Sequence, residues 1–69
     1  MLHPDAEMMV REVIEEGAAN PVLFANTVAF ALEIWEFSDL PHAPEVVAAL
    51  RRCTSVEAAR AILANPASE

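Results

Sequence analysis

The feature that most constrains the fold is the stretch NPVLFANTVAFALEIWEF, which runs from Asn20 to Phe37. It opens with asparagine, a favoured helix N-cap, and proline, which suits the first helical position. At about 100° per residue, Asn26, Glu33 and Glu36 share one narrow strip, and nearly every other position is apolar. A helix that is apolar almost all round is normally buried. This segment is therefore expected to be the central helix of the fold.

The prolines and the single glycine divide the rest of the chain into further helical stretches. Apolar residues recur in these stretches at helical spacing, and no stretch alternates with the period of two that marks a strand. The connections are only a few residues long, as in helical bundles. The chain is expected to be one domain, residues 1–69, folded as a compact all-α bundle of four short helices. Their predicted bounds are about 4–16, 21–37, 44–52 and 55–64.

Several helix ends carry their own signals. Gly17 is the expected C′ residue of the first helix, because glycine commonly follows a helix C-terminus. Thr54 and Glu57 have capping-box spacing, in which the threonine hydroxyl accepts a hydrogen bond from the backbone N–H of the glutamate. Asn65 and Pro66 are expected to end the last helix.

Size and charge narrow the class of protein. A chain of 69 residues buries only about 60% of its unfolded surface, so oligomerisation or a partner is a common remedy for a marginal core. The single cysteine favours a reducing compartment. The N-terminus lacks the basic region of a signal peptide. No apolar run reaches the roughly 20 residues that a membrane span needs. The expected location is the cytoplasm. A composition heavy in Ala, Val, Glu and Arg favours a bacterial or phage source.

The charge is asymmetric. Residues 1–45 hold nine acids and one arginine, for −8, and residues 46–69 hold three arginines and two acids, for +1, which together give the net −7. Phosphate contacts need clustered Lys and Arg, so direct nucleic-acid binding is not expected. The acidity promotes solubility, or it forms a face that meets a basic partner.

No catalytic or cofactor motif is present, so no enzyme activity, no cofactor and no metal are expected. His3, His42 and Cys53 lack zinc-site spacing, and only a coincidence of the tertiary fold could group them with nearby acids such as Asp5. A nucleophilic pair of Cys53 with His42 is a minor alternative, since Cys53 precedes the N-terminus of the last predicted helix. The competing interpretations are a buried apolar cysteine and histidines in surface loops or caps.

The leading hypothesis is a non-enzymatic helical module that binds another protein, or a second copy of itself in a homo-oligomer. Adaptor, assembly, inhibitor and antitoxin-like roles all fit this description. Three short helices offer mostly small side chains to cover the segment 21–37, so part of its apolar surface is expected to stay exposed and form an interface. Core packing is the competing interpretation for each of its side chains. The predicted partner interface comprises Phe24, Phe30, Glu33, Ile34, Trp35, Glu36 and Phe37.

A second hypothesis comes from the charge. The acidic N-terminal half could imitate nucleic acid and block a nucleic-acid-binding protein, with acids spread over residues 5–16. Salt should weaken such binding steeply, whereas it should leave an apolar interface unchanged or slightly stronger. The change of binding affinity with salt concentration therefore separates the two hypotheses.

Overall fold

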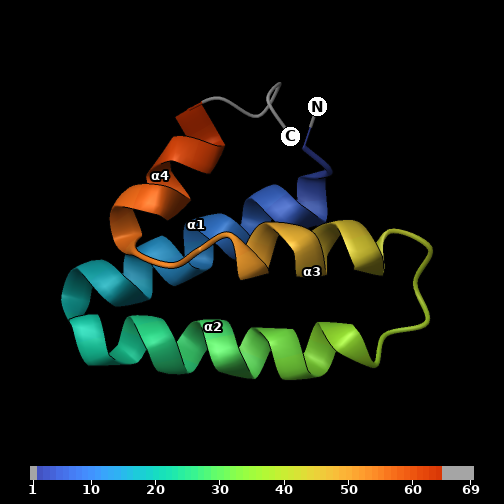
Figure 1. Cartoon of the computed structure of the whole chain (residues 1–69), viewed down its shortest axis with the longest axis horizontal. Helices are drawn as coiled ribbons and strands as arrows, with labels where there is room; N and C mark the ends of the chain where they lie inside the picture. The colour runs from blue at the N-terminus through green and yellow to red at the C-terminus, as the bar shows by residue number, and fades with distance from the viewer. Residues whose placement is uncertain (1, 65–69) are drawn as a thin grey trace.

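The computed structural model describes residues 2–64, in which four helices follow one another and no strand occurs. The helices are α1 (Pro4–Ala19), α2 (Pro21–Glu36), α3 (Ala43–Arg51) and α4 (Val56–Ala64). The predicted all-α bundle of four short helices is confirmed (Figure 1). Across the described part of the chain, no helix combines the length and apolarity that crossing a bilayer would require. The predicted stop signal at residues 65–66 lies outside the described residues.

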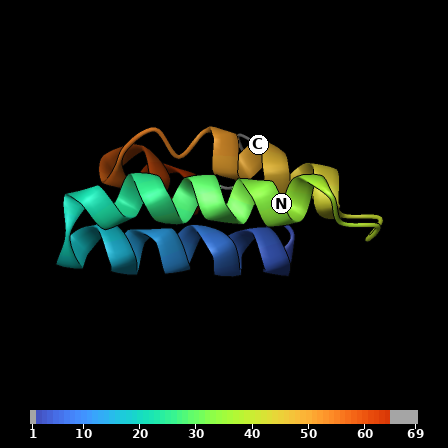
Figure 2. The ribbon, with the colours of Figure 1, turned by 90° about the horizontal axis from the view of Figure 1, so that it is seen from below.

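A single residue joins α1 to α2. The backbone N–H of Asn20 donates to the carbonyl of Glu16 and closes the last turn of α1. Its side-chain Oδ1 accepts from the N–H of Val22, 3.0 Å away, and so caps the start of α2. The predicted cap is confirmed, and the short connection makes α1 and α2 an antiparallel pair that lies side by side in Figure 2.

The prediction that Gly17 ends α1 is wrong. The helix continues to Ala19, and no residue with positive φ is present among those described. Gly17 is instead buried where three helices meet. A Cβ atom there would lie 2.6 Å from Cδ1 and 2.8 Å from Cβ of Phe24, and 2.8 Å from Cγ2 of Val56. The position therefore needs glycine for its lack of a side chain, which lets α2 and α4 approach α1 closely.

The central helix is α1, which corrects the prediction that the segment 21–37 would be central. Among the described residues, α1 packs extensively on α2, α3 and α4, whereas α2 packs on α1 and α3. The reason is the small side chains and the glycine on the inner face of α1, which allow neighbours on several sides. The buried residues of α1 are Ala6, Val10, Val13 and Gly17.

A histidine caps the start of α1, as one interpretation of His3 expected, whereas the cap of α4 differs from the predicted one. Nδ1 of His3 accepts from the N–H of Asp5 at 3.1 Å and caps α1. At α4, the hydroxyl of Ser55 accepts from the N–H of Ala58 at 3.0 Å. The predicted cap at Thr54 was therefore one residue too early, because α4 begins at Val56 and its first turn requires an acceptor at residue 55.

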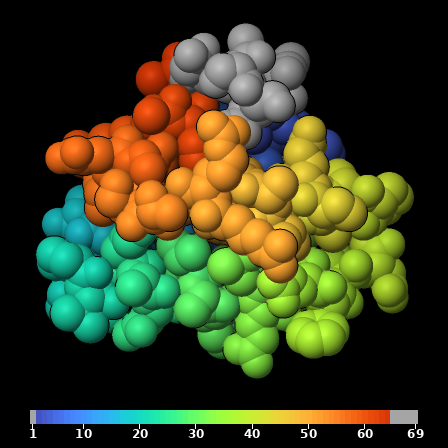
Figure 3. Space-filling model, viewed as in Figure 1, coloured from blue at the N-terminus to red at the C-terminus, as the bar shows by residue number. Residues whose placement is uncertain are grey.

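The α2 helix is half exposed, although its composition suggested full burial. Its buried residues are Phe24 and Ala31. The principal extents are 32 × 26 × 15 Å, so the molecule is too thin for a helix to be surrounded on all sides. In the space-filling view, α3 covers one side of α2 and the opposite edge of α2 faces solvent (Figure 3). This open edge carries the candidate site.

Candidate interaction surface on α2

Three apolar side chains on the solvent-facing side of α2, together with Phe37 directly after the helix, form a stripe that we call the α2 stripe. At about 100° per residue its members fall within an arc of about 60°, so they share one face of the helix. They are exposed despite their size: Leu23 41%, Ile34 54%, Phe30 65% and Phe37 82%. No other helix in residues 2–64 has three large apolar residues this exposed on one face.

The α2 stripe is large for so small a protein. With about 200 Å² for each aromatic side chain, the exposed fractions of Phe30 and Phe37 alone leave roughly 300 Å² of apolar surface in water. Leu23 and Ile34 enlarge this area. A contiguous apolar patch of several hundred square ångströms on a soluble protein usually marks a binding surface.

Acidic residues lie on both edges of the α2 stripe. On the edge away from α1, Glu33 is exposed. In projection down the helix axis, it lies about 40° from Phe37 and about 60° from Phe30. On the other edge, α1 lies against α2 and contributes exposed Glu12 and Glu16. Two flanks of one apolar surface therefore carry the same charge.

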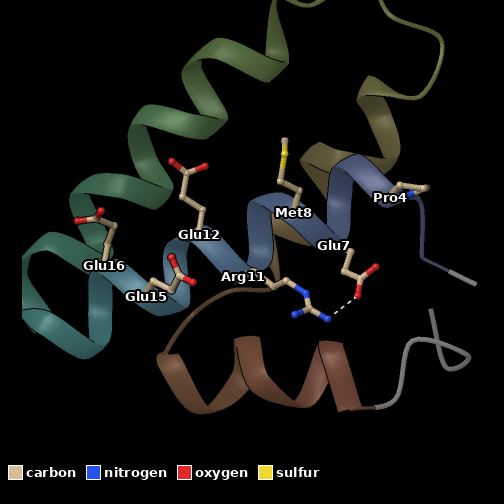
Figure 4. Close-up of a pocket in the computed structure, with 7 residues that line it drawn as sticks. All are labelled: Pro4, Glu7, Met8, Arg11, Glu12, Glu15 and Glu16. Carbon is tan, nitrogen blue, oxygen red and sulfur yellow. Dashed lines mark hydrogen bonds and ion pairs between the residues drawn. The ribbon is translucent and has the colours of Figure 1, made fainter.

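Figure 4 shows the solvent-facing side of α1. Met8 and Glu12 point toward the side on which α2 lies, and Met8 is about half exposed, which adds an apolar contact next to the α2 stripe. Arg11 points toward the side of α4 and forms an ion pair with Glu7 at 2.8 Å. The residues that line this shallow, acidic surface are Pro4, Glu7, Met8, Arg11, Glu12, Glu15 and Glu16.

The structure separates the predicted interface residues into three groups. Phe30, Ile34, Phe37 and Glu33 lie on the α2 stripe or its edge. The other three residues, Phe24, Trp35 and Glu36, do not lie there.

Phe24 is buried against Gly17, and Trp35 is half-buried against the core, as the competing interpretation of core packing expects for these two side chains. They point inward because they fall on the α2 face that α1 and α3 cover. Glu36 is exposed on the side of α3, where its Oε1 accepts from Arg51 at 2.8 Å.

Two residues of this surface were absent from the predicted interface. Leu23 lies seven positions before Phe30, which places it on the same face two turns earlier. Met8 falls on the polar side of α1, where an apolar side chain is out of place. Both signals are present in the sequence. Because apolar residues lie on nearly every side of α2, however, the sequence does not indicate which face of this helix is exposed to solvent.

The structure does not support a nucleophilic pair of Cys53 with His42. The two residues lie at opposite ends of α3, a nine-residue helix about 13 Å long. Cys53 is buried, and its Sγ donates to the carbonyl of Ala49 at 3.4 Å. His42 instead lies against His3 and Asp5.

Comparison of the chain with protein-family models, with curated proteins and with solved structures finds no match.

Proposed function

We propose that this protein is a non-enzymatic interaction module that docks another protein on the α2 stripe. The observation that carries the proposal is the stripe itself, in which Phe30 on α2 is exposed at 65% and Phe37, directly after α2, at 82%, on a side of the helix that the fold leaves open. Aromatic residues placed in the centre of an interface commonly dominate its binding energy. Phe30 and Phe37 are the proposed anchors.

The acidic edges favour a different protein over a second copy as the partner. Homodimers normally have a two-fold axis, which pairs each surface with itself. If the two-fold axis is perpendicular to α2, the edge that holds Glu33 in one copy faces the same edge of the other, and the two α1 helices face each other. If the axis is parallel to α2, the edge that holds Glu33 in one copy faces the edge that holds Glu12 and Glu16 in the other. Either arrangement sets carboxylates against carboxylates, so the complementary partner has an apolar ridge flanked by Lys or Arg.

The alternative role as a nucleic-acid mimic rests on the acidic side of α1, where Glu12, Glu15 and Glu16 are all exposed. A partner bound there would interact mainly through charge, and its binding would weaken steeply with salt. A partner on the α2 stripe gains most of its affinity from apolar burial, so salt would chiefly slow its association. We favour the α2 stripe because it combines apolar area with charge.

Sedimentation equilibrium over a range of protein and salt concentrations tests this proposal. At low salt we expect a monomer of 7.5 kDa, because the acidic edges repel a second copy. At about 1 M salt the screening length falls to about 3 Å and apolar contacts persist, so weak self-association through the α2 stripe should appear. Substitution of Phe37→Ser should remove that association, and Arg60→Ser on α4 should not.

A tight dimer at low salt would contradict the argument from the acidic edges. High-salt association that is unchanged in Phe30→Ser and Phe37→Ser would contradict the α2 stripe as the adhesive surface. Circular dichroism of each variant provides the folding control, because both phenylalanines are mostly exposed and their removal should leave the helical signal intact.

A further inference from the structure

Two histidines and one aspartate meet where the start of α1 touches the loop before α3. Nε2 of His42 lies 2.6 Å from Oδ2 of Asp5, a contact between residues 37 positions apart. The rings of His3 and His42 stack with centroids 4.0 Å apart and planes 6° apart. One potential ligand atom from each of these three residues lies within 4.8 Å of the other two. We call this group the His–Asp cluster.

We infer that the His–Asp cluster is a binding site for a first-row divalent metal ion of the zinc class. Two imidazole nitrogens and one carboxylate oxygen form a donor set typical of Zn²⁺, Co²⁺ and Ni²⁺. Mg²⁺ and Ca²⁺ prefer all-oxygen ligands, and the cluster offers only one carboxylate. Three protein ligands leave at least one coordination position for water. This inference is independent of the α2 stripe.

The distances require only side-chain adjustment. Metal–ligand bonds of about 2.0–2.1 Å in a tetrahedral site separate the ligand atoms by roughly 3.3 Å. The present separations, from 2.6 Å to at most 4.8 Å, lie on either side of that value. A nitrogen lone pair lies in the plane of its ring, so two parallel rings cannot both aim at one ion. Binding must therefore tilt one imidazole and break the stack.

The protons must rearrange as well. Nδ1 of His3 now accepts the N–H of Asp5, so in a neutral ring the proton is on Nε2, and an ion that binds Nδ1 replaces this capping bond. His42 must carry its proton on Nδ1, so that Nε2 is free to bind the ion. The contact between Nε2 and Asp5 is then lost. The ion thus exchanges two hydrogen bonds for three coordinate bonds and ties α1 to the loop before α3.

The chain contains a built-in reporter of this site. Trp35 is its only tryptophan, and its ring centroid lies 5.8 Å from that of His42. Paramagnetic Co²⁺ at the cluster should quench the fluorescence of Trp35, and Zn²⁺, which has a filled d shell, should displace Co²⁺ and restore the signal. The titration uses the full chain without an affinity tag, so that every histidine belongs to the protein.

Two variants remove one ligand each. In His3→Asn the new amide oxygen can still cap α1, and Asp5→Asn keeps the shape of the side chain without its charge. We expect saturable 1:1 quenching that Zn²⁺ reverses, and a Co²⁺ dissociation constant at least about tenfold weaker in both variants. Asp39→Asn, in the same loop as His42 but outside the cluster, should bind as the parent chain does.

Two results would overturn the inference. One is the absence of saturable quenching in the parent chain. The other is quenching that His3→Asn and Asp5→Asn leave unchanged, because the ions would then be held by exposed acids elsewhere. Circular dichroism verifies that each variant remains helical, and His3→Asn decides the matter if Asp5→Asn is unfolded, since it leaves the contact between Asp5 and His42 in place.

Discussion

Replacement of Gly17 by alanine is expected to destabilise this protein, although helix propensity alone predicts the opposite. Gly17 lies within α1, and alanine in the interior of a helix is more favourable than glycine by about 1 kcal/mol. The added methyl group would lie 2.6 Å and 2.8 Å from two atoms of Phe24 and 2.8 Å from Val56. All three distances are shorter than a normal carbon–carbon contact of about 3.5 Å.

The sign of the effect depends on whether the neighbours can move. One of the close atoms is Cβ of Phe24 and another is Cγ2 of Val56. No rotamer change moves Cβ of Phe24, so α2 must shift to relieve that contact. Cγ2 of Val56 could move only by rotation about χ1, away from the rotamer that valine strongly prefers in a helix. Overpacking of this kind typically costs 1–3 kcal/mol. With contacts on two sides we take about 3 kcal/mol, which leaves a net loss of about 2 kcal/mol after the gain from helix propensity.

Urea unfolding followed by circular dichroism measures this loss. With a slope of about 1 kcal/mol per molar urea for so small a domain, the midpoint for Gly17→Ala should fall by roughly 2 M. The matched control is Ala18→Gly, at the exposed neighbouring position, which should lose about 1 kcal/mol through propensity alone. A stabilised Gly17→Ala variant would refute the close approach of α2 and α4 to α1 at this position.

Three further predictions concern the fold. Ser55→Ala should cost about 1 kcal/mol of unfolding free energy, because Ser55 caps α4, and equal losses in Thr54→Ala would contradict this assignment. Leu50→Ala should cost about 2–5 kcal/mol, since Leu50 is fully buried; a loss below 1 kcal/mol in urea unfolding would count against its place in the core. The thiol of Cys53 is buried, so a thiol reagent should modify it far more slowly in the folded chain than in urea, and equal rates would show that the site is open.

The number and approximate bounds of the helices could be predicted because the signals are local. Prolines, caps and the 3.6-residue period act within a few residues of where they stand. Asn20 shows how strong such a signal is, since it caps α2 as predicted. Gly17 shows the limit of the approach, because whether a glycine ends a helix or admits a neighbour depends on residues distant in the chain.

The arrangement of the helices could not be predicted in the same way. The apolar composition of α2 indicated burial, but burial requires neighbours on every side, and small residues on α1 gave that role to α1. Exposure of Phe30 and Phe37 was expected as a consequence of short partner helices, but the sequence left open whether each apolar side chain, Trp35 included, would be exposed or packed in the core. The contact between Asp5 and His42 joins residues 37 positions apart, and no local pattern predicts it.

The proposed docking surface is tested most directly by site-specific photocrosslinking in the cells that produce the protein. A photoreactive phenylalanine analogue at position 37 should form an adduct whose mass differs from twice that of the chain, and the same analogue at Arg60 on α4 should form none. Mass spectrometry of the adduct should identify a partner segment with apolar residues flanked by Lys or Arg. Adducts that form equally at both positions, or at neither, would contradict the assignment of the α2 stripe as the site of partner binding.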